Sequence, residues 1–301
     1  MTSHFESVVK ADIERLIPLI ESALLPPVSG GEAPKLREAM RYSLEAGGKR
    51  VRPLLCLLTA ESLGKPAQSA LSCAIAMEYV HTYSLIHDDL PAMDDDDLRR
   101  GKPTNHKVYG EGQAILAGDG LLTEAFGILA GDAALSAAQK VETFQILADA
   151  AGCRGMVGGQ SLDLEGEVLC RSGKPYDRSH LQLIHRLKTG ALLRASLELG
   201  AIAAGAAQDT RSALREAGAA LGLAFQIQDD ILDTTSTSDV MGKRVRKDEE
   251  KCKITYPKLL GLDGARKALR EATERAIFLL QPIPNPASLI AWANILSMRT
   301  N

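Results

Sequence analysis

Hydrophobic residues recur at helical spacing along nearly the whole chain. In the segment 67–89 the apolar positions follow one another at steps of three or four, so they share one helix face: Leu71, Ile75, Tyr79, Tyr83 and Ile86. The same spacing recurs in the segments 180–203, 211–233 and 264–280. No stretch alternates between apolar and polar residues for long enough to indicate a β-strand. The pattern therefore predicts an all-α protein.

Glycine and proline clusters divide this pattern into about ten helices with short loops. A chain of 301 residues can bury a large core, and its composition of 45% hydrophobic but only 4% aromatic residues makes that core mostly leucine, alanine, isoleucine and methionine, which favour helix. Neither a linker nor a short internal repeat interrupts the chain. We therefore expect one domain over residues 1–301, a helical bundle around a central active-site cavity.

Charge and cysteine content narrow the classes of function. A formal net charge of -3 and a sequence pI near 6.1 argue against a nucleic-acid partner. The five cysteines are odd in number and have no CxxC spacing, which argues against structural zinc and a disulfide framework. The N-terminus has no signal-peptide pattern, and no apolar run reaches the ~18 residues of a membrane span. These features predict a soluble, cytoplasmic protein without membrane insertion.

An acidic cluster ends the apolar segment 67–89. The sequence there is HDDLPAMDDDDLRRG, from His87 to Gly101. Adjacent carboxylates that emerge from a core repel one another and are costly to desolvate, and a hard divalent cation such as Mg²⁺ offsets that cost. Pro91 breaks the helix, which lets Asp94 fold back toward Asp88. The pair Arg99–Arg100 beside the cluster suits phosphate oxygens.

A second acidic cluster lies in the sequence QIQDDILD, residues 226–233. Asp229 and Asp233 are four residues apart and Asp230 and Asp233 three, so all three carboxylates can project from one helix face. Their neighbours are apolar, and a carboxylate triad on an apolar helix is more often functional than decorative.

Cations surround these clusters at several points of the chain. Gly47-Gly48-Lys49-Arg50-Val51-Arg52 joins two predicted helices, and a glycine pair followed by cations at a helix start suits an anion. Lys188-Thr189-Gly190 lies within a helix, and Lys243 and Lys253 follow the second cluster. His81 lies seven residues before Asp88, hence about 10 Å away on the same face. Two diphosphates bound side by side with Mg²⁺ would explain this arrangement.

Taken in order, the motifs resemble the trans-type polyprenyl diphosphate synthases. LIHDDLPAMDDDDLRRGKPTNH and FQIQDDILD resemble the two aspartate-rich motifs of that family, and GGKRVRP, GMVGGQSLDL, HRLKTGALL and MGK…TYP follow its order from about residue 40 to 260. Within that family the chain most resembles the bacterial farnesyl diphosphate synthases, with plant geranylgeranyl diphosphate synthases as near relatives. The resemblance implies an isoprenoid-synthase fold, isoprenoid diphosphate substrates and a homodimer.

The resemblance also implies a role for each matching residue. Mg²⁺, three ions per active site, would be held by Asp88, Asp89, Asp94, Asp229, Asp230 and Asp233. The allylic diphosphate would contact Arg99, Lys188 and Lys243. Isopentenyl diphosphate would contact Gly48, Lys49, Arg52, His81 and Arg100. Gln160, Asp163 and Lys253 would lie near the phosphates, and the oxygens of Thr189 and Gln226 would face the developing cation. Asp88 and Asp229 join Lys188, Thr189 and Gln226 as the catalytic set.

Two residues before the first motif bear on product length. In the resembling family the residues four and five before the first aspartate form the floor of the chain pocket, and here they are Ser84 and Tyr83. An aromatic side chain closes such a pocket, so Tyr83 predicts a fifteen-carbon product, farnesyl diphosphate. The alternative is that Tyr83 belongs only to the core stripe of its helix.

Other functions are weighed against this one. The same chemistry could continue to geranylgeranyl diphosphate. A terpene cyclase would need a ring-lined pocket, which an aromatic content of 4% does not favour. A metal phosphohydrolase needs further histidine ligands, and a regulatory subunit would be expected to have lost one aspartate motif. Where the family often has glycine after the second motif, this chain has Arg246 and Cys252, which puts lid flexibility in doubt.

Overall fold

The computed structural model describes residues 4–173, 177–235 and 254–298. The elements follow in the order α1 (His4–Leu24), η1 (Pro26–Ser29), α2 (Pro34–Leu44), α3 (Val51–Ser62), η2 (Ala67–Ala70), α4 (Leu71–Asp88), β1 (Leu98–Arg99), β2 (Lys102–Pro103), α5 (Asn105–Tyr109), α6 (Glu111–Gly131), α7 (Ala137–Ala151), α8 (Met156–Arg171), α9 (Arg178–His185), η3 (Arg186–Gly190), α10 (Ala191–Ala203), α11 (Gln208–Thr235), α14 (Tyr256–Leu280) and α15 (Ala287–Met298). The all-α bundle predicted from the sequence is confirmed.

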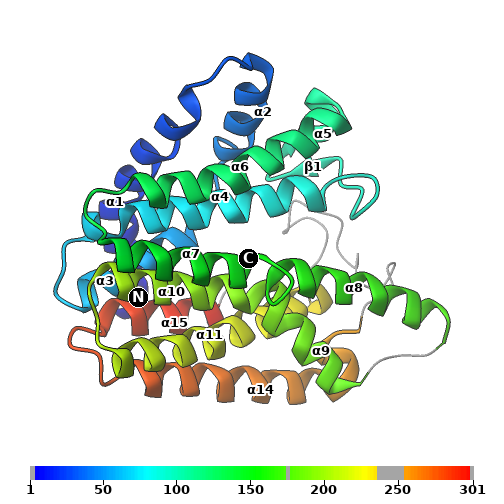
Figure 1. The fold of residues 1–301 in the computed structure, drawn as a ribbon. Helices are drawn as coiled ribbons and strands as arrows, with labels where there is room; N and C mark the ends of the chain where they lie inside the picture. The colour runs from blue at the N-terminus through cyan, green and yellow to red at the C-terminus, as the bar shows by residue number, and fades with distance from the viewer. Residues whose placement is uncertain (1–3, 174–176, 236–253, 299–301) are drawn as a thin grey trace.

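The helices form one packed bundle (Figure 1). α4 and α6 run side by side, with α1 and α2 beside them, and α10, α11 and α14 pack in sequence on the other side. α3 packs against both α4 and α10, so it joins the two groups. A large core of buried leucine, alanine, isoleucine and methionine side chains runs through most of these helices. A smaller core lies between α9, α11 and α14.

Local sequence signals account for several helix boundaries. Ser136 caps α7, where its hydroxyl accepts a hydrogen bond from the Gln139 N–H while the Gln139 side chain accepts one from the Ser136 N–H. Asp177 caps α9, where its carboxylate accepts a hydrogen bond from the N–H of His180. Proline stands in the first turn of both α2 and α14, where a missing N–H costs nothing.

The structure departs from the predicted pattern in two places. Two strands of two residues each, β1 and β2, pair antiparallel directly after the first acidic cluster, with Arg99 opposite Lys102. These strands are too short to give an alternating pattern. In addition, α6 is long and apolar enough to cross a membrane by length and composition alone, which the expectation of no such run missed. α6 packs against α2, α4, α5 and α7, as a helix of the bundle does.

Candidate active site

The two acidic clusters lie at the ends of α4 and α11. After α4 the chain turns back on itself, and the N–H of Asp94 donates a hydrogen bond of 2.8 Å to the carbonyl of Asp88. This confirms that the break at Pro91 folds Asp94 back toward Asp88. The turn thus gathers two carboxylates that a continuous helix would place on different faces.

Asp88 faces both a carboxylate and a cation. Burial raises the pKa of its carboxyl to about 6, Lys188 opposes that rise, and Asp94 adds to it. Lys188 lies in η3, so this electrostatic interaction brings the middle of the α9–η3–α10 run close to the end of α4. An anionic carboxylate with a raised pKa binds a cation favourably, because the cation relieves both the desolvation and the repulsion.

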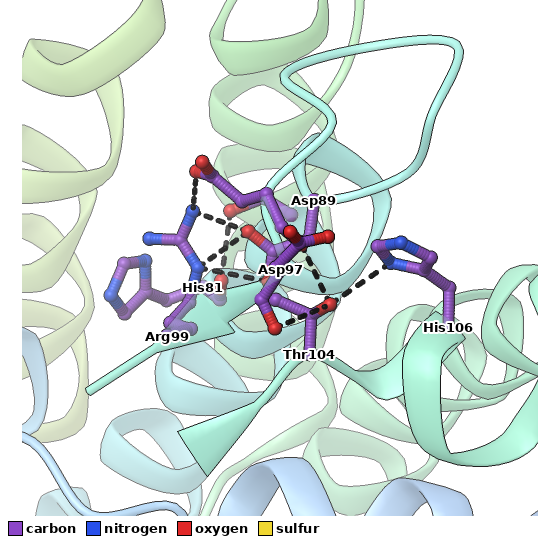
Figure 2. Close-up of polar contacts among 8 residues, drawn as sticks. His81, Asp89, Asp97, Arg99, Thr104 and His106 are labelled. Carbon is purple, nitrogen blue, oxygen red and sulfur yellow. Dashed lines mark hydrogen bonds and ion pairs between the residues drawn. The ribbon is translucent and has the colours of Figure 1, made fainter. Parts of the chain in front are cut away.

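Asp89 has a different partner from its neighbour. Figure 2 shows Arg99 between His81 and Asp89, and the Arg99 Nε lies 2.7 Å and 2.9 Å from the two carboxylate oxygens of Asp89. Only 3% of Asp89 is exposed. The ion pair holds β1 against the end of α4, so the structure gives Asp89 a clear role in orienting Arg99.

The outer aspartates of the first cluster shape the loop. The Thr104 hydroxyl donates to the carbonyl of Asp96 at 2.7 Å and lies 3.1 Å from the His106 Nδ1 (Figure 2). The Thr104 N–H donates to the carbonyl of Asp97, and Lys107 pairs with the Asp97 carboxylate at 2.8 Å. Sequence reasoning did not single out these partners, because only the fold brings them to the loop.

The second cluster contains a chain of hydrogen bonds. The Thr189 hydroxyl donates to the Gln226 Oε1 at 2.8 Å, and the Gln226 amide donates to the Asp230 Oδ1 at 3.3 Å. The other oxygen of Asp230 accepts the N–H of Tyr256 at 3.0 Å. Asp230 is buried, whereas Asp229 and Asp233 are partly exposed on the same helix. The chain fixes the orientation of Thr189 and Gln226, two residues expected to face the substrate.

His185 supports the same end of α11, and sequence reasoning did not assign it a role. Its ring stacks on Tyr256 with centroids 5.6 Å apart, and its Nε2 lies 3.7 Å from the Asp230 carboxylate. Burial lowers the pKa of His185 to about 3, so the ring is neutral. His185 is the first residue of the motif HRLKTGALL, and that position could have indicated a role for it.

Lys188 and Thr189 lie in a π-helical segment, η3. A single π-helical turn inserts an extra residue into a helix and is frequent at functional sites. A Cβ on Gly159 would lie 2.2 Å from the Lys188 backbone N, and one on Gly222 would lie 2.6 Å from the Gly190 Cα. Glycine is therefore required at both positions, because α8 and α11 each approach the turn closely and hold it in place.

The Lys188 ammonium ion-pairs with Asp163 of α8 at 2.7 Å. Three residues earlier on the same helix, the Gln160 Oε1 is buried and accepts no hydrogen bond within the described residues. Gln160 and Asp163 thus belong to the helix that packs against the π-helical turn, and their place near the phosphates stays a prediction. An unpaired buried acceptor is costly, so a ligand or water at this point would stabilise it.

The basic segment at the start of α3 divides between core and site. Arg50 is 2% exposed, and its guanidinium pairs with Glu78 at 2.6 Å and Glu21 at 2.8 Å. It also donates to the carbonyl of Leu44 at 2.6 Å. The expectation that this run of cations serves an anion is therefore wrong for Arg50, whose long-range partners the sequence alone did not reveal. Lys49 on the same segment is exposed.

Four arginines act on His81. Burial lowers the pKa of His81 well below its ordinary value, and the arginines Arg52, Arg100, Arg99 and Arg50 lower it further. Four arginines therefore act on one neutral ring. The buried Arg52 Nε has no hydrogen-bond partner within the described residues. This positive region suits a polyanion with several acceptor oxygens.

Arg52 and Arg100 also connect the basic region to its surroundings. Burial lowers the pKa of Arg52 to about 10, while Glu78 and Asp229 raise it, so Arg52 faces the second acidic cluster. Gly48 has a φ of +132°, and a Cβ there would lie 2.6 Å from the Arg100 guanidinium. Gly48 therefore leaves room for Arg100, which donates to the carbonyl of Gly47.

The two residues expected to set product length lie one turn before Asp88. Tyr83 is 5% exposed, and its ring meets the His87 ring edge-on with centroids 5.7 Å apart. His87 in turn contacts the carbonyl of Ile115 on α6. Tyr83 is thus a buried core residue that lies against His87, and His87 in turn reaches α6. The Ser84 hydroxyl donates back to the carbonyl of His81.

The donor set around the acidic clusters fits Mg²⁺. No group of three or more histidine, cysteine, aspartate or glutamate side chains forms a ready metal site in residues 4–173, 177–235 and 254–298. One or two carboxylates at each cluster, completed by water and phosphate oxygens, is the coordination that Mg²⁺ prefers. Lys243 and Lys253, together with Arg246 and Cys252, lie outside the described residues.

Known proteins resemble this chain over most of its length. A farnesyl diphosphate synthase of Geobacillus stearothermophilus is 52% identical over 85% of this chain and 86% of its own. A farnesyl diphosphate synthase of Haemophilus influenzae is 46% identical over 98% of this chain and 99% of its own. A geranylgeranyl pyrophosphate synthase large subunit of Arabidopsis thaliana is also 46% identical, over 94% of this chain and 77% of its own.

Solved structures agree with these relatives. The apo structure of an FPP/GFPP synthase from Zymomonas mobilis has a TM-score of 0.85 at 37% identity, covering 97% of this chain and 99% of that one. A geranyltransferase from Legionella pneumophila has a TM-score of 0.82 at 36% identity, covering 99% and 97%. The family model Polyprenyl synthetase matches residues 33–278. With both aspartate motifs at one end of the bundle, the chain belongs to the polyprenyl synthetase family.

Proposed function

We propose that this chain is a Mg²⁺-dependent farnesyl diphosphate synthase. It condenses isopentenyl diphosphate with dimethylallyl diphosphate and then with geranyl diphosphate, and releases diphosphate at each step. One observation carries the proposal: Lys188 interacts with Asp88, whose carboxylate also faces Asp94. His81, around which the basic region lies, is on the same helix as Asp88. The family membership and the names of the similar proteins support the substrate class.

Each acidic cluster has a defined task in this proposal. Asp88 and Asp94, with Asp89 in support, would hold Mg²⁺ for the allylic diphosphate, and Asp229, with Asp230 and Asp233, would hold a further ion. We infer three ions per active site. When bound, Mg²⁺ neutralises charge on the departing diphosphate. Arg99 and Lys188, with Lys243 and Lys253, contact the phosphate oxygens.

The basic region holds the second substrate. Gly48, Lys49, Arg52, His81 and Arg100 would bind isopentenyl diphosphate with its double bond toward the allylic carbon. Arg52 lies at the junction, because it faces Asp229. Gln160 and Asp163 complete the phosphate side, where Asp163 already orients Lys188. Positioning the two reactants in this way removes much of the entropic cost of a bimolecular step.

The reaction follows from these positions. The allylic C–O bond ionises as cationic groups stabilise the leaving diphosphate, an electrostatic contribution that is usually the largest in catalysis. The oxygens of Thr189 and Gln226, fixed by Asp230, face the developing carbocation. The double bond of isopentenyl diphosphate attacks that carbon, a new C–C bond forms, and a proton leaves to the released diphosphate. An apolar surrounding keeps water from the carbocation.

Tyr83 favours a fifteen-carbon product over geranylgeranyl diphosphate. Its buried ring lies against His87 on α4, about one turn before Asp88. A growing chain that extends down α4 from the first cluster would meet this ring. Geranylgeranyl diphosphate remains the alternative product, because the plant relatives are nearly as similar.

We also propose a cytoplasmic homodimer. Only 33% of the apolar window of α6 is buried within the chain, and Ile115 and Leu116 on that helix are 44% and 54% exposed. We call these exposed apolar residues the apolar stripe of α6. A second copy of the same helix would bury this stripe symmetrically. Burial of α6 in a dimer would explain its apolar composition without insertion into a membrane.

One assay tests the function and the metal site together. The protein is incubated with Mg²⁺, labelled isopentenyl diphosphate and geranyl diphosphate, and elongated products are counted. Asp229→Asn should lower turnover by at least ~100-fold because it removes a charged ligand at the leaving group. Asp209→Asn on the same helix is the matched control and should retain activity. Equal activity of the two variants would contradict the assignment of the second cluster.

A further inference from the structure

A polar cleft lies between α7, α10 and α11, away from both aspartate clusters. Its volume is about 400 Å³, and it is lined by Gln145, Ile146, Asp149, Arg194, Glu198, Gln208, Arg211, Ser212 and Arg215. We call this the arginine cleft. The three helices lie together because α7 and α11 each pack against α10 (Figure 1). Arg215 precedes Asp229 by fourteen residues on α11, about 21 Å along the helix.

The arginines of the cleft surround one buried carboxylate without hydrogen-bonding to it. The two oxygens of Glu198 lie 3.8 Å from the Arg194 Nε and 3.7 Å from the Arg215 Nε, beyond ordinary hydrogen-bond distance. Glu198 is only 8% exposed. The Arg194 Nε is buried and has no hydrogen-bond partner within the described residues. A buried donor in that position is costly to leave unpaired.

Charges around the cleft favour an anion. Arg211 pairs with Glu142 at 2.5 Å, and Asp149 pairs with Arg154 on its other side. Those two carboxylates are each matched by one arginine, so Glu198 alone faces both Arg194 and Arg215. One cation is therefore in excess. Two guanidinium groups that converge on a space of this size present paired donors to an oxyanion, as in many phosphate sites.

We propose that the arginine cleft is a second anion site, which binds a phosphate-type anion through Arg194 and Arg215. The anion accepts the hydrogen bonds that Glu198 is too far away to accept. Inorganic phosphate and inorganic diphosphate share this chemistry. Ile146 is the only large apolar residue of the lining, so a prenyl tail would add little to binding. The proposal stands independently of the prenyltransferase function.

Calorimetric titration of the metal-free protein with inorganic diphosphate tests it. The wild type should bind at the basic region around His81 and at the arginine cleft, hence two anions per chain. Arg215→Gln should weaken the cleft site at least tenfold, because it removes a charge-assisted hydrogen bond. Arg275→Gln is the matched control: Arg275 pairs with Glu216 and is 54% exposed, against 50% for Arg215, and it lies outside the cleft. That variant should keep both sites.

A second variant makes the opposite prediction. Glu198→Gln removes the carboxylate that competes for Arg194 and Arg215, so it should tighten the cleft site by about tenfold. A parallel titration with inorganic phosphate shows which of the two anions the cleft prefers. The proposal is overturned if Arg215→Gln and Arg275→Gln bind diphosphate alike, or if Glu198→Gln weakens binding. If the wild type binds diphosphate only at the arginine cleft and not at the basic region around His81, the proposed function is contradicted and the cleft assignment is not.

Discussion

At the scale of single residues, neighbouring carboxylates acquire different tasks from their partners. Asp88 and Asp89 are adjacent, yet Asp89 is matched by the Arg99 guanidinium, whereas Asp88 faces Asp94 and carries a raised pKa. Asp229 and Asp230 differ in the same way, because Asp230 is buried and accepts two hydrogen bonds from the chain. In each pair the first aspartate is thus the better candidate for direct contact with Mg²⁺.

The raised pKa of Asp88 makes the metal-free fold sensitive to pH. Burial raises this pKa from 3.8 to about 6, so between these values the folded chain holds a proton that the unfolded chain releases. The free energy of unfolding should therefore decrease as the pH rises from about 4 to about 6, by up to ~3 kcal/mol from this group. Urea titrations with a metal chelator present measure it. Asp88→Asn should remove this contribution, and an unchanged pH slope would contradict the assignment.

Tyr83 should limit the length of the product. Tyr83→Ala removes a buried ring of α4 and leaves space in the core before the first cluster. We expect the main product to shift from fifteen to twenty carbons or longer, measured by chromatography of the dephosphorylated products. Tyr109→Ala, on α5, is the control and should leave the distribution unchanged. An unaltered product in Tyr83→Ala would mean that the ring serves the core alone.

At the scale of elements, the π-helical turn η3 is held by glycines on its neighbours. Gly159 of α8 and Gly222 of α11 permit backbone contacts that fix Lys188 and Thr189 between the aspartate clusters. These contacts explain why small residues recur on the helices around the site. Close helix packing, rather than a loop, thus positions Lys188 and Thr189.

Gly159→Ala should disturb this turn. The added Cβ would lie 2.2 Å from the Lys188 backbone, so helix α8 or η3 must shift. We expect a loss of ~1–3 kcal/mol in the free energy of unfolding and a lower kcat. Gly112→Ala on α6 is the control, since its Cβ meets nothing within 4 Å and alanine favours helix. Thermal unfolding and steady-state rates of both variants check this, and equal behaviour would contradict the packing argument.

The sequence predicted the helical segments and the two motifs well, because apolar spacing and aspartate runs are local signals. It also predicted the fold-back of Asp94 from Pro91. It did not predict that Arg50 is buried, because Glu21 and Glu78 lie about thirty residues away on other helices. Nor did it predict the π-helical turn, because α8 and α11 each approach that turn closely from distant parts of the chain.

At the scale of the whole molecule, a net charge of -3 conceals opposed local fields. Aspartates gather at the ends of α4 and α11, and arginines gather around His81 between them. The apolar stripe of α6 lies on the outside of the same helix pair that carries the first cluster and Tyr83. Association of two copies through α6 would therefore stabilise the helix pair that includes Tyr83.

Leu116→Glu should disrupt the proposed homodimer. A charge in the centre of an apolar interface is costly to bury, so the variant should elute as a monomer in size-exclusion chromatography with light scattering. Val168→Glu on α8 is the matched control, since Val168 is 66% exposed on another face. That variant should behave as the wild type does. If Leu116→Glu and the wild type show the same mass, α6 is not the interface.

The most direct test of the central claim is the identity of the product. The purified protein is incubated with Mg²⁺, labelled isopentenyl diphosphate and dimethylallyl diphosphate, and the dephosphorylated products are separated by chain length. We expect farnesol as the main labelled alcohol, with no elongation when a chelator replaces Mg²⁺. A cyclic product, or no elongated product at all, would contradict it.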